Sequence, residues 1–138
     1  MTGDNLNFSK GSSVLITNHE NAEAFIKMFA SNKYLIFSID GTKINSKKDL
    51  LSRLASEMKF PTYFGNNWDA LEECLKDLNW FIENGYVIRF INADKFIKDH
   101  PSDFRVLIEI AEAVANHWKF HKVEFILIVE TNDLAIAI

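Results

Sequence analysis

The chain has 138 residues, 48% hydrophobic and 25% charged, which is the composition of one soluble globular domain. Its net charge of −4 argues against direct nucleic-acid binding, because neutralising phosphates requires a basic surface. The single cysteine, Cys74, excludes an intramolecular disulfide. The sequence shows neither a signal-peptide pattern nor the ~20 consecutive apolar residues of a membrane span, so we expect a cytoplasmic protein.

The N-terminal segment, residues 1–33, predicts one strand and one helix after about a dozen polar residues. Ser13 to Thr17 has the apolar run of a short strand. Residues 18–32 predict a helix, with Asn18 preferred over Asn21 as its cap. The apolar face of that helix holds Phe25, Ile26 and Phe29. The segment either adds an edge strand and a helix to the fold or covers an interface, and this apolar face favours the first.

The next segment predicts a strand, a helix and a proline stop. Tyr34 to Asp40 has the pattern of a strand, closed by the turn dipeptide Asp40-Gly41. Ser46 then caps a helix, with Asp49 in place of the usual capping-box acid. The apolar face of this helix holds Leu50, Leu51, Leu54 and Met58. Phe60-Pro61 ends it, because the residue before proline is pushed out of the helical region.

The second half of the chain alternates helices with strands. A helix from about Asn67 to Leu78 precedes a strand at Tyr86–Ile91, and a helix that opens at Pro101 precedes a strand at Val123–Glu130. The apolar stripe of the longer helix comprises Phe104, Leu107, Ile108, Ala111, Val114, Ala115 and Trp118. The last strand is almost continuously apolar, which predicts cover on both faces. Because helices separate the strands, the order predicts an α/β domain with a small parallel sheet.

The segment PTYFGNNWDALEECLKDLNW, residues 61–80, concentrates the acids of the chain. Between Pro61 and Glu83 five acids stand against one base, Lys76, a net charge of −4, so the rest of the chain balances to zero. The five acids are Asp69, Glu72, Glu73, Asp77 and Glu83. Such a segment favours a cationic partner or a metal ion.

Local rules explain the start of this segment. Gly65 predicts a turn with a positive φ, and Asn66 or Asn67 caps the helix that follows. Asp69 then lies beside free backbone N–H groups, where the helix dipole favours a carboxylate by ~0.3–1 kcal/mol. Asp69 alone therefore needs no functional explanation.

The remaining acids are harder to explain locally. Asp69 with Glu73, and Glu73 with Asp77, are like-charged i,i+4 pairs that cost ~0.2–0.5 kcal/mol each, and Lys76 relieves part of this from four residues after Glu72. The opposite, apolar face holds Trp68, Leu71, Cys74, Leu75 and Leu78. Periodicity alone therefore favours a solvent-facing acidic surface.

The residues PTYFGNNWDALEECL resemble the signature helix of the barstar family, intracellular inhibitors of the secreted ribonuclease barnase. The upstream FSIDGTKINSKKDLLSRLASEMKFP is similar to that family's first strand, helix and entry to the motif. The resemblance runs from about Tyr34 to Glu130. It implies a barstar-like domain at residues 34–138, with residues 1–33 as an extension packed on it. The implied fold is a small three-stranded parallel sheet packed with helices, which the N-terminal strand and helix could extend.

The resemblance also implies an immunity-type inhibitor. The acidic helix and the loop before it would enter the basic active site of a ribonuclease or nuclease toxin and take the places of RNA phosphates. Glu73 stands where barstar has its principal aspartate, and Glu72 where barstar has an aromatic residue, so a different cationic partner fits at least as well as barnase. The implied partner-binding residues are Tyr63, Phe64, Gly65, Asn66, Asn67, Asp69, Glu72, Glu73, Lys76 and Asp77.

Two other functions stay open on the sequence. An acidic protein-binding module of the same fold would take a cationic partner that is not a nuclease. A metal-dependent nuclease could hold Mg²⁺ on Asp69, Glu72 and Glu73, but no Lys or His stands beside them to act on a water. His117 and His121 have i,i+4 spacing but straddle an expected helix end and lack a third ligand nearby. We therefore expect no catalytic residues, no cofactor and no metal, no binding to membranes, and a monomer or weak dimer when free.

Overall fold

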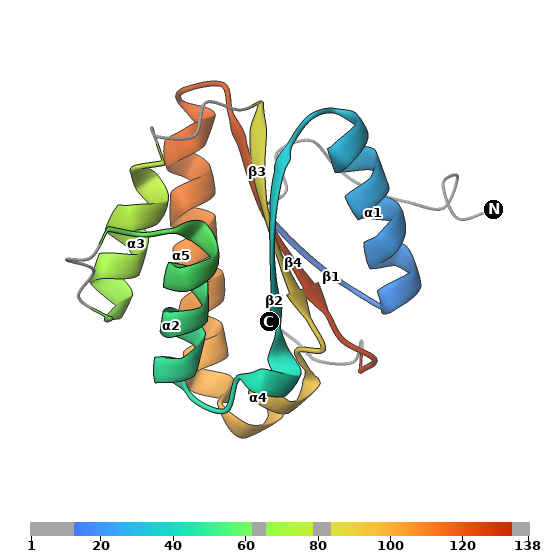
Figure 1. Cartoon of the computed structure of the whole chain (residues 1–138), viewed down its shortest axis with the longest axis vertical. Helices are drawn as coiled ribbons and strands as arrows, with labels where there is room; N and C mark the ends of the chain where they lie inside the picture. The colour runs from blue at the N-terminus through green and yellow to red at the C-terminus, as the bar shows by residue number, and fades with distance from the viewer. Residues whose placement is uncertain (1–12, 62–65, 79–83, 134–138) are drawn as a thin grey trace.

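The computed structural model describes residues 13–61, 66–78 and 84–133, in which helices cover both faces of a four-stranded sheet (Figure 1). The strands are β1 (Val14–Thr17), β2 (Leu35–Asp40), β3 (Gly85–Ile91) and β4 (Glu124–Glu130). The helices are α1 (His19–Ser31), α2 (Lys47–Met58), α3 (Trp68–Lys76), α4 (Asp94–Asp99) and α5 (Pro101–Lys119), with a 3-10 turn, η2, at Gly41–Lys43. Helix α1 lies on one face of the sheet, and α2, α3 and α5 lie on the other (Figure 1). None of these helices is long and apolar enough to cross a membrane.

The sheet order is β1-β4-β3-β2, and every neighbouring pair is parallel. The predicted α/β class with a parallel sheet is therefore confirmed. The sheet has four strands and not the implied three, because the N-terminal segment adds β1 as an edge strand beside β4, the extension that the sequence favoured. Strand β1 pairs with β4 from Val14 opposite Leu127 to Thr17 opposite Glu130. This pairing satisfies backbone groups that an unpaired β4 edge would leave exposed.

The apolar core lies on both faces of the sheet. A larger cluster fills the space between the sheet and α2, α3 and α5. A smaller cluster lies under α1 and comprises Ala22, Phe25, Phe29, Val87, Ile126 and Ile128. Strand β4 contributes alternate residues to the two clusters, Phe125 and Leu127 to the larger and Ile126 and Ile128 to the smaller. The predicted cover on both faces of the last strand is confirmed.

The predicted helix caps are also present. The Asn18 side chain accepts a 2.8 Å hydrogen bond from the Asn21 amide at the start of α1. The Ser46 hydroxyl accepts from the Asp49 amide at 3.1 Å at the start of α2. At the other end of α2, Lys59 adopts a left-handed conformation with φ 55°, which ends the helix just before Phe60-Pro61. The sequence therefore sets both boundaries of α2 locally.

Helix α4 is an element that the sequence prediction lacks. It has only six residues, Asp94–Asp99, which is too short for a recognisable helical period. His100 then leaves the helical region, with φ −134° and ψ 59°, because it precedes Pro101. Pro101 opens α5 in its first turn, as predicted.

An ion-pair network with a buried centre, Arg89 and Glu130, joins α1 to the sheet. Arg89 on β3 donates from Nε and Nη2 to Glu130 Oε2 on β4, at 3.0 and 2.8 Å. The same Nη2 lies 2.7 Å from Glu23 Oε2 on α1, and the His19 imidazole contacts the other oxygen of Glu130. The hydrogen bond and positive charge of Arg89 lower the pKa of Glu23. The network thus attaches α1 to the two central strands.

Candidate partner-binding site

The acidic helix α3 begins one residue after its cap, Asn67. The Asn67 side chain accepts a hydrogen bond from the Ala70 amide at 2.8 Å. Of the two asparagines predicted as possible caps, Asn67 is therefore the one that caps the helix. Asn66 precedes it in the left-handed region with φ 53°, a conformation that asparagine tolerates better than most residues. Asp69 therefore occupies the second helical position, within the first turn, where its carboxylate is favoured by the helix dipole.

The inward face of α3 fixes the helix on the core. Leu71, Cys74 and Leu75 are buried, and so is Leu78 just beyond the helix. Trp68, which was predicted on the same face, is only half-buried. The ammonium of Lys47 on α2 lies 5.8 Å from the centroid of the Trp68 ring, a cation–π contact that the sequence did not suggest. The start of α3 is thus attached to the start of α2.

Helix α3 is shorter than the sequence predicts. It ends at Lys76, with Asp77 as its C-cap, whereas the prediction extended it to Leu78. Asp77 has φ −120° and ψ 58°, and its amide bonds to the Cys74 carbonyl in a tightened last turn. Asp77 is therefore exposed at the end of the helix and is not part of its helical face.

Two side chains from other elements hold this end of α3. The Trp118 indole on α5 donates to the Leu75 carbonyl at 2.8 Å. The Tyr86 hydroxyl on β3 donates to the Leu78 carbonyl at 3.2 Å. Carbonyls at a helix C-terminus have no partner within the helix, so these bonds satisfy groups that would otherwise need water. Trp118 is 43 residues from Leu75, and Tyr86 is eight residues from Leu78, which is not a helical spacing. The sequence pattern therefore did not predict either hydrogen bond.

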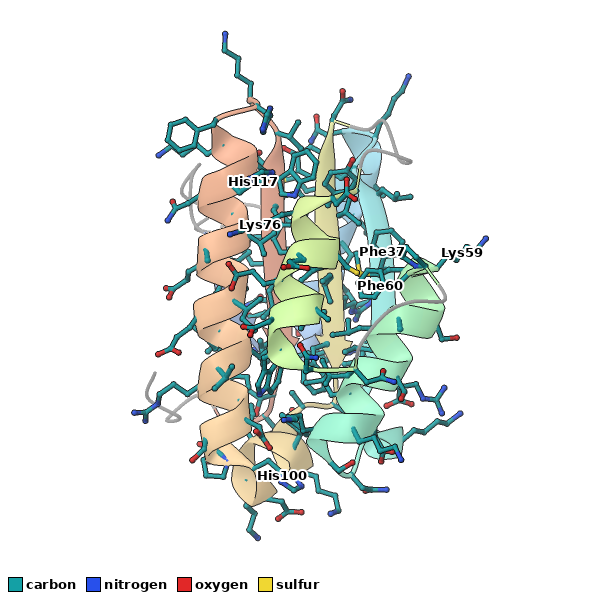
Figure 2. All side chains as sticks on the ribbon, turned by 90° about the vertical axis from the view of Figure 1, so that its left-hand side faces the viewer. Phe37, Lys59, Phe60, Lys76, His100 and His117 are labelled. Carbon is teal, nitrogen blue, oxygen red and sulfur yellow. The ribbon has the colours of Figure 1, made fainter. Side chains whose placement is uncertain are left out.

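The carboxylates of α3 fall into two groups. Asp69 and Glu73 are exposed and lie four residues apart, on one side of the helix and about 6 Å apart along its axis. Glu72 instead pairs with Lys76, whose ammonium lies 2.6 Å from Glu72 Oε2, and each of these side chains is 34% exposed. Figure 2 shows Lys76 on the side of α3 that faces α5. Glu72 is therefore largely neutralised within the chain, whereas Asp69 and Glu73 face solvent.

The pKa of the Cys74 thiol is raised by its position behind this acidic surface. Burial raises its pKa first, and the negative charges of Asp77 and Glu73 raise it further. A thiol with a raised pKa is a poor nucleophile at neutral pH. Cys74 therefore acts as a buried apolar residue, as its position in the helical period indicated.

Most of the predicted site residues can be placed. Asn66 and Asn67 are exposed at the start of α3, next to Asp69. Glu73 follows on the same helix. Tyr63, Phe64 and Gly65, which were also predicted as partner-binding residues, lie outside the described residues. No group of three or more His, Cys, Asp or Glu side chains in the described ranges could hold a metal ion. The described site is thus a capped helix, packed on the core, that presents carboxylates to solvent.

The family model described as Barstar (barnase inhibitor) matches residues 34–130. The chain belongs to the barstar family. Its barstar match begins one residue before β2 and ends at the last residue of β4, so it contains the whole of α3. Strand β1 and helix α1 lie outside the match. No curated protein matches the chain significantly.

Proposed function

We propose that this barstar-family protein inhibits a ribonuclease or nuclease toxin by covering the enzyme's basic active site with α3 and the loop before it. The observation that carries the proposal is the barnase-inhibitor family match across α3, a helix with exposed carboxylates at Asp69 and Glu73. In this mechanism the two carboxylates take the places of RNA phosphates. The inhibitor itself catalyses no reaction.

The geometry of α3 suits such a role. Carboxylates on a helix that is already fixed by its cap and by Trp118 lose little freedom on binding, which favours affinity. A nuclease cleft that binds RNA carries Lys and Arg, so opposite charge also accelerates encounter. Fast encounter matters when a toxic enzyme must be bound before it cleaves cellular RNA.

Titration of ribonuclease activity tests the proposal. The full chain is added to barnase and, in parallel, to a partner captured from native host extract on the immobilised chain. We expect stoichiometric inhibition of one of these enzymes, and the inhibition should weaken as salt is raised. The double variant Asp69→Asn/Glu73→Gln should lose it, whereas Glu20→Gln/Glu112→Gln, which removes the same charge from exposed positions on α1 and α5, should retain it.

Two outcomes would contradict the proposal in different ways. Full inhibition by a folded Asp69→Asn/Glu73→Gln variant would show that the site lies elsewhere. Capture of a basic protein that lacks nuclease activity, through the same two carboxylates, would favour the acidic binding module instead. Circular dichroism of each variant separates both outcomes from loss of folding.

A further inference from the structure

The imidazole rings of His117 and His121 lie side by side at the end of α5. Their centroids are 5.1 Å apart and their planes are tilted by 52°. The helix ends at Lys119, but Phe120 keeps helical dihedral angles and the His121 amide bonds to the Trp118 carbonyl at 2.8 Å. The chain therefore continues on a nearly helical path to His121, and the two side chains keep the mutual position of i,i+4 residues.

Contrary to the expectation from the sequence, we propose that His117 and His121 form a two-histidine site for a borderline divalent cation, with Zn²⁺ the best fit. Two imidazoles on a tetrahedral ion, with metal–nitrogen bonds of about 2.0–2.1 Å, have ring centroids about 5 Å apart. The observed centroid separation is close to this value. Imidazole is also a preferred ligand of zinc, copper and nickel. No third ligand from the described ranges joins the pair, so water or a group from another molecule completes the coordination.

Each of the other two histidines uses one ring nitrogen in a contact within the chain, unlike the two histidines of this pair. His19 uses a ring nitrogen on Glu130, and His100 uses one on the Asn45 carbonyl. Across the described ranges, no residue forms a hydrogen bond to the ring of His117 or His121. His121 is exposed and His117 is half-buried, so an ion can reach both from solvent.

The surroundings of the pair favour a cation. The bond from Trp118 to the Leu75 carbonyl joins the last turns of α5 and α3, so the carbonyl ends of two helices meet here. The carbonyl end of a helix carries a partial negative charge that stabilises cations. Lys119 and Lys122 oppose this effect nearby, but both are exposed and therefore screened by salt.

A bound ion would be coupled to the acidic helix through one residue. The Trp118 ring lies 5.3 Å from the His117 ring and 5.8 Å from the His121 ring, centroid to centroid. The same indole holds Leu75 at the end of α3. An ion on the two imidazoles would restrain this indole, and Trp118 provides a fluorescent reporter of binding beside the site.

Calorimetric titration of the full chain with ZnCl₂ tests the site directly. We expect one Zn²⁺ per chain, released by a chelator, and at least about tenfold weaker binding in His117→Asn and in His121→Asn. His100→Gln is the control, since it removes one imidazole at the opposite end of the molecule (Figure 2) and should leave the affinity unchanged. Quenching of tryptophan fluorescence by CuCl₂ should be reduced in Trp118→Phe.

Three results would overturn the proposal. The first is the absence of saturable Zn²⁺ binding to the wild-type chain. The second is unchanged affinity in both His117→Asn and His121→Asn. The third is an equal loss in His100→Gln, which would indicate nonspecific binding by surface imidazoles.

Discussion

The indole nitrogen of Trp118 donates a 2.8 Å hydrogen bond to the backbone carbonyl of Leu75. The bond joins the last turn of α5 to the last turn of α3, which are 43 residues apart in the chain. Trp118 is partly buried against the core and also packs its ring on Tyr86, at 5.3 Å between centroids. Trp118 thus attaches the end of the acidic helix to α5 and to the core, beside the bond from the Tyr86 hydroxyl to the Leu78 carbonyl.

Replacing Trp118 by Phe should loosen the end of α3. The change removes the hydrogen bond, worth ~0.5–1.5 kcal/mol, and some packing, so we expect a total loss of about 1–3 kcal/mol in unfolding free energy. Urea denaturation measures the loss, and hydrogen exchange should show faster exchange of α3 amides. Phe120→Leu is the control: this ring is 89% exposed, so its truncation should change stability by less than about 0.5 kcal/mol. Unchanged exchange in α3 would contradict the role given to Trp118.

Replacing Arg89 by Met should be far more costly than breaking a surface pair. The Arg89 and Glu130 side chains are 10% and 4% exposed, so removing the guanidinium leaves a buried carboxylate with too few partners. We expect a loss of about 3–5 kcal/mol in unfolding free energy. Lys95→Met breaks the exposed pair Lys95–Asp99 and should cost no more than ~1 kcal/mol. Similar losses in the two variants would mean that the Arg89 network contributes no more than a surface ion pair.

The sequence predicted elements that depend on neighbouring residues and missed those that depend on distant ones. The caps at Asn18 and Ser46, the buried strand β4 and the pairing of Glu72 with Lys76 all follow from spacings of a few residues, and all are present. The fourth strand lies between these cases, because the sequence predicted the strand and favoured an edge position but did not identify its partner. Its pairing with β4 joins residues more than a hundred positions apart, and no local pattern encodes that contact.

The candidate site shows the same division. The outward orientation of Asp69 and Glu73 follows from the helical period, because apolar residues occupy the other face. The contact of Lys47 with Trp68 does not, since it joins two helices across a loop. The early end of α3 also escaped prediction, because the polar residue Asp77 could equally have continued the helix.

Gly85 is required because the Tyr34 ring lies over it. A Cβ at Gly85 would meet Tyr34 Cε2 at 2.6 Å, and the Tyr34 hydroxyl bonds to Glu124 beyond it. Gly85→Ala should displace the ring and cost about 1–3 kcal/mol in unfolding free energy, measured by denaturation. In a Tyr34→Ala background, where the ring is absent, the same change should cost much less. An equal cost in both backgrounds would contradict the steric explanation.

The ionisation of Tyr34 should depend on this arrangement. Burial first, and then the hydrogen bond and charge of Glu124, raises the pKa of Tyr34 from 10.0 to about 12. Because the folded-state pKa is the higher one, the neutral phenol contributes stability that is complete below about pH 10 and lost as the pH rises through about 12. Ultraviolet titration of phenolate should show a late phase that Tyr34→Phe removes. A late phase that persists in Tyr34→Phe would contradict the assignment to Tyr34.

Glu72 and Glu73 are adjacent acids that should differ in their effect on a bound nuclease. Under the proposed function, Glu73 is exposed and meets the cations of the enzyme, so Glu73→Gln should cost about 1.5–3 kcal/mol of binding free energy as a lost charge-assisted hydrogen bond. Glu72 is already paired with Lys76, so Glu72→Gln should cost less than about 1 kcal/mol.

Lys76 provides the control for this comparison. Lys76→Met releases Glu72 from its pair and adds one negative charge to the acidic surface, so association at low salt should become faster. Stopped-flow mixing with the nuclease measures this rate, and the increase should disappear in Lys76→Met/Glu72→Gln, which restores the net charge. Equal losses of affinity in Glu72→Gln and Glu73→Gln would contradict this explanation. Only a Glu72 that is not paired with Lys76 could contribute as much to binding as Glu73.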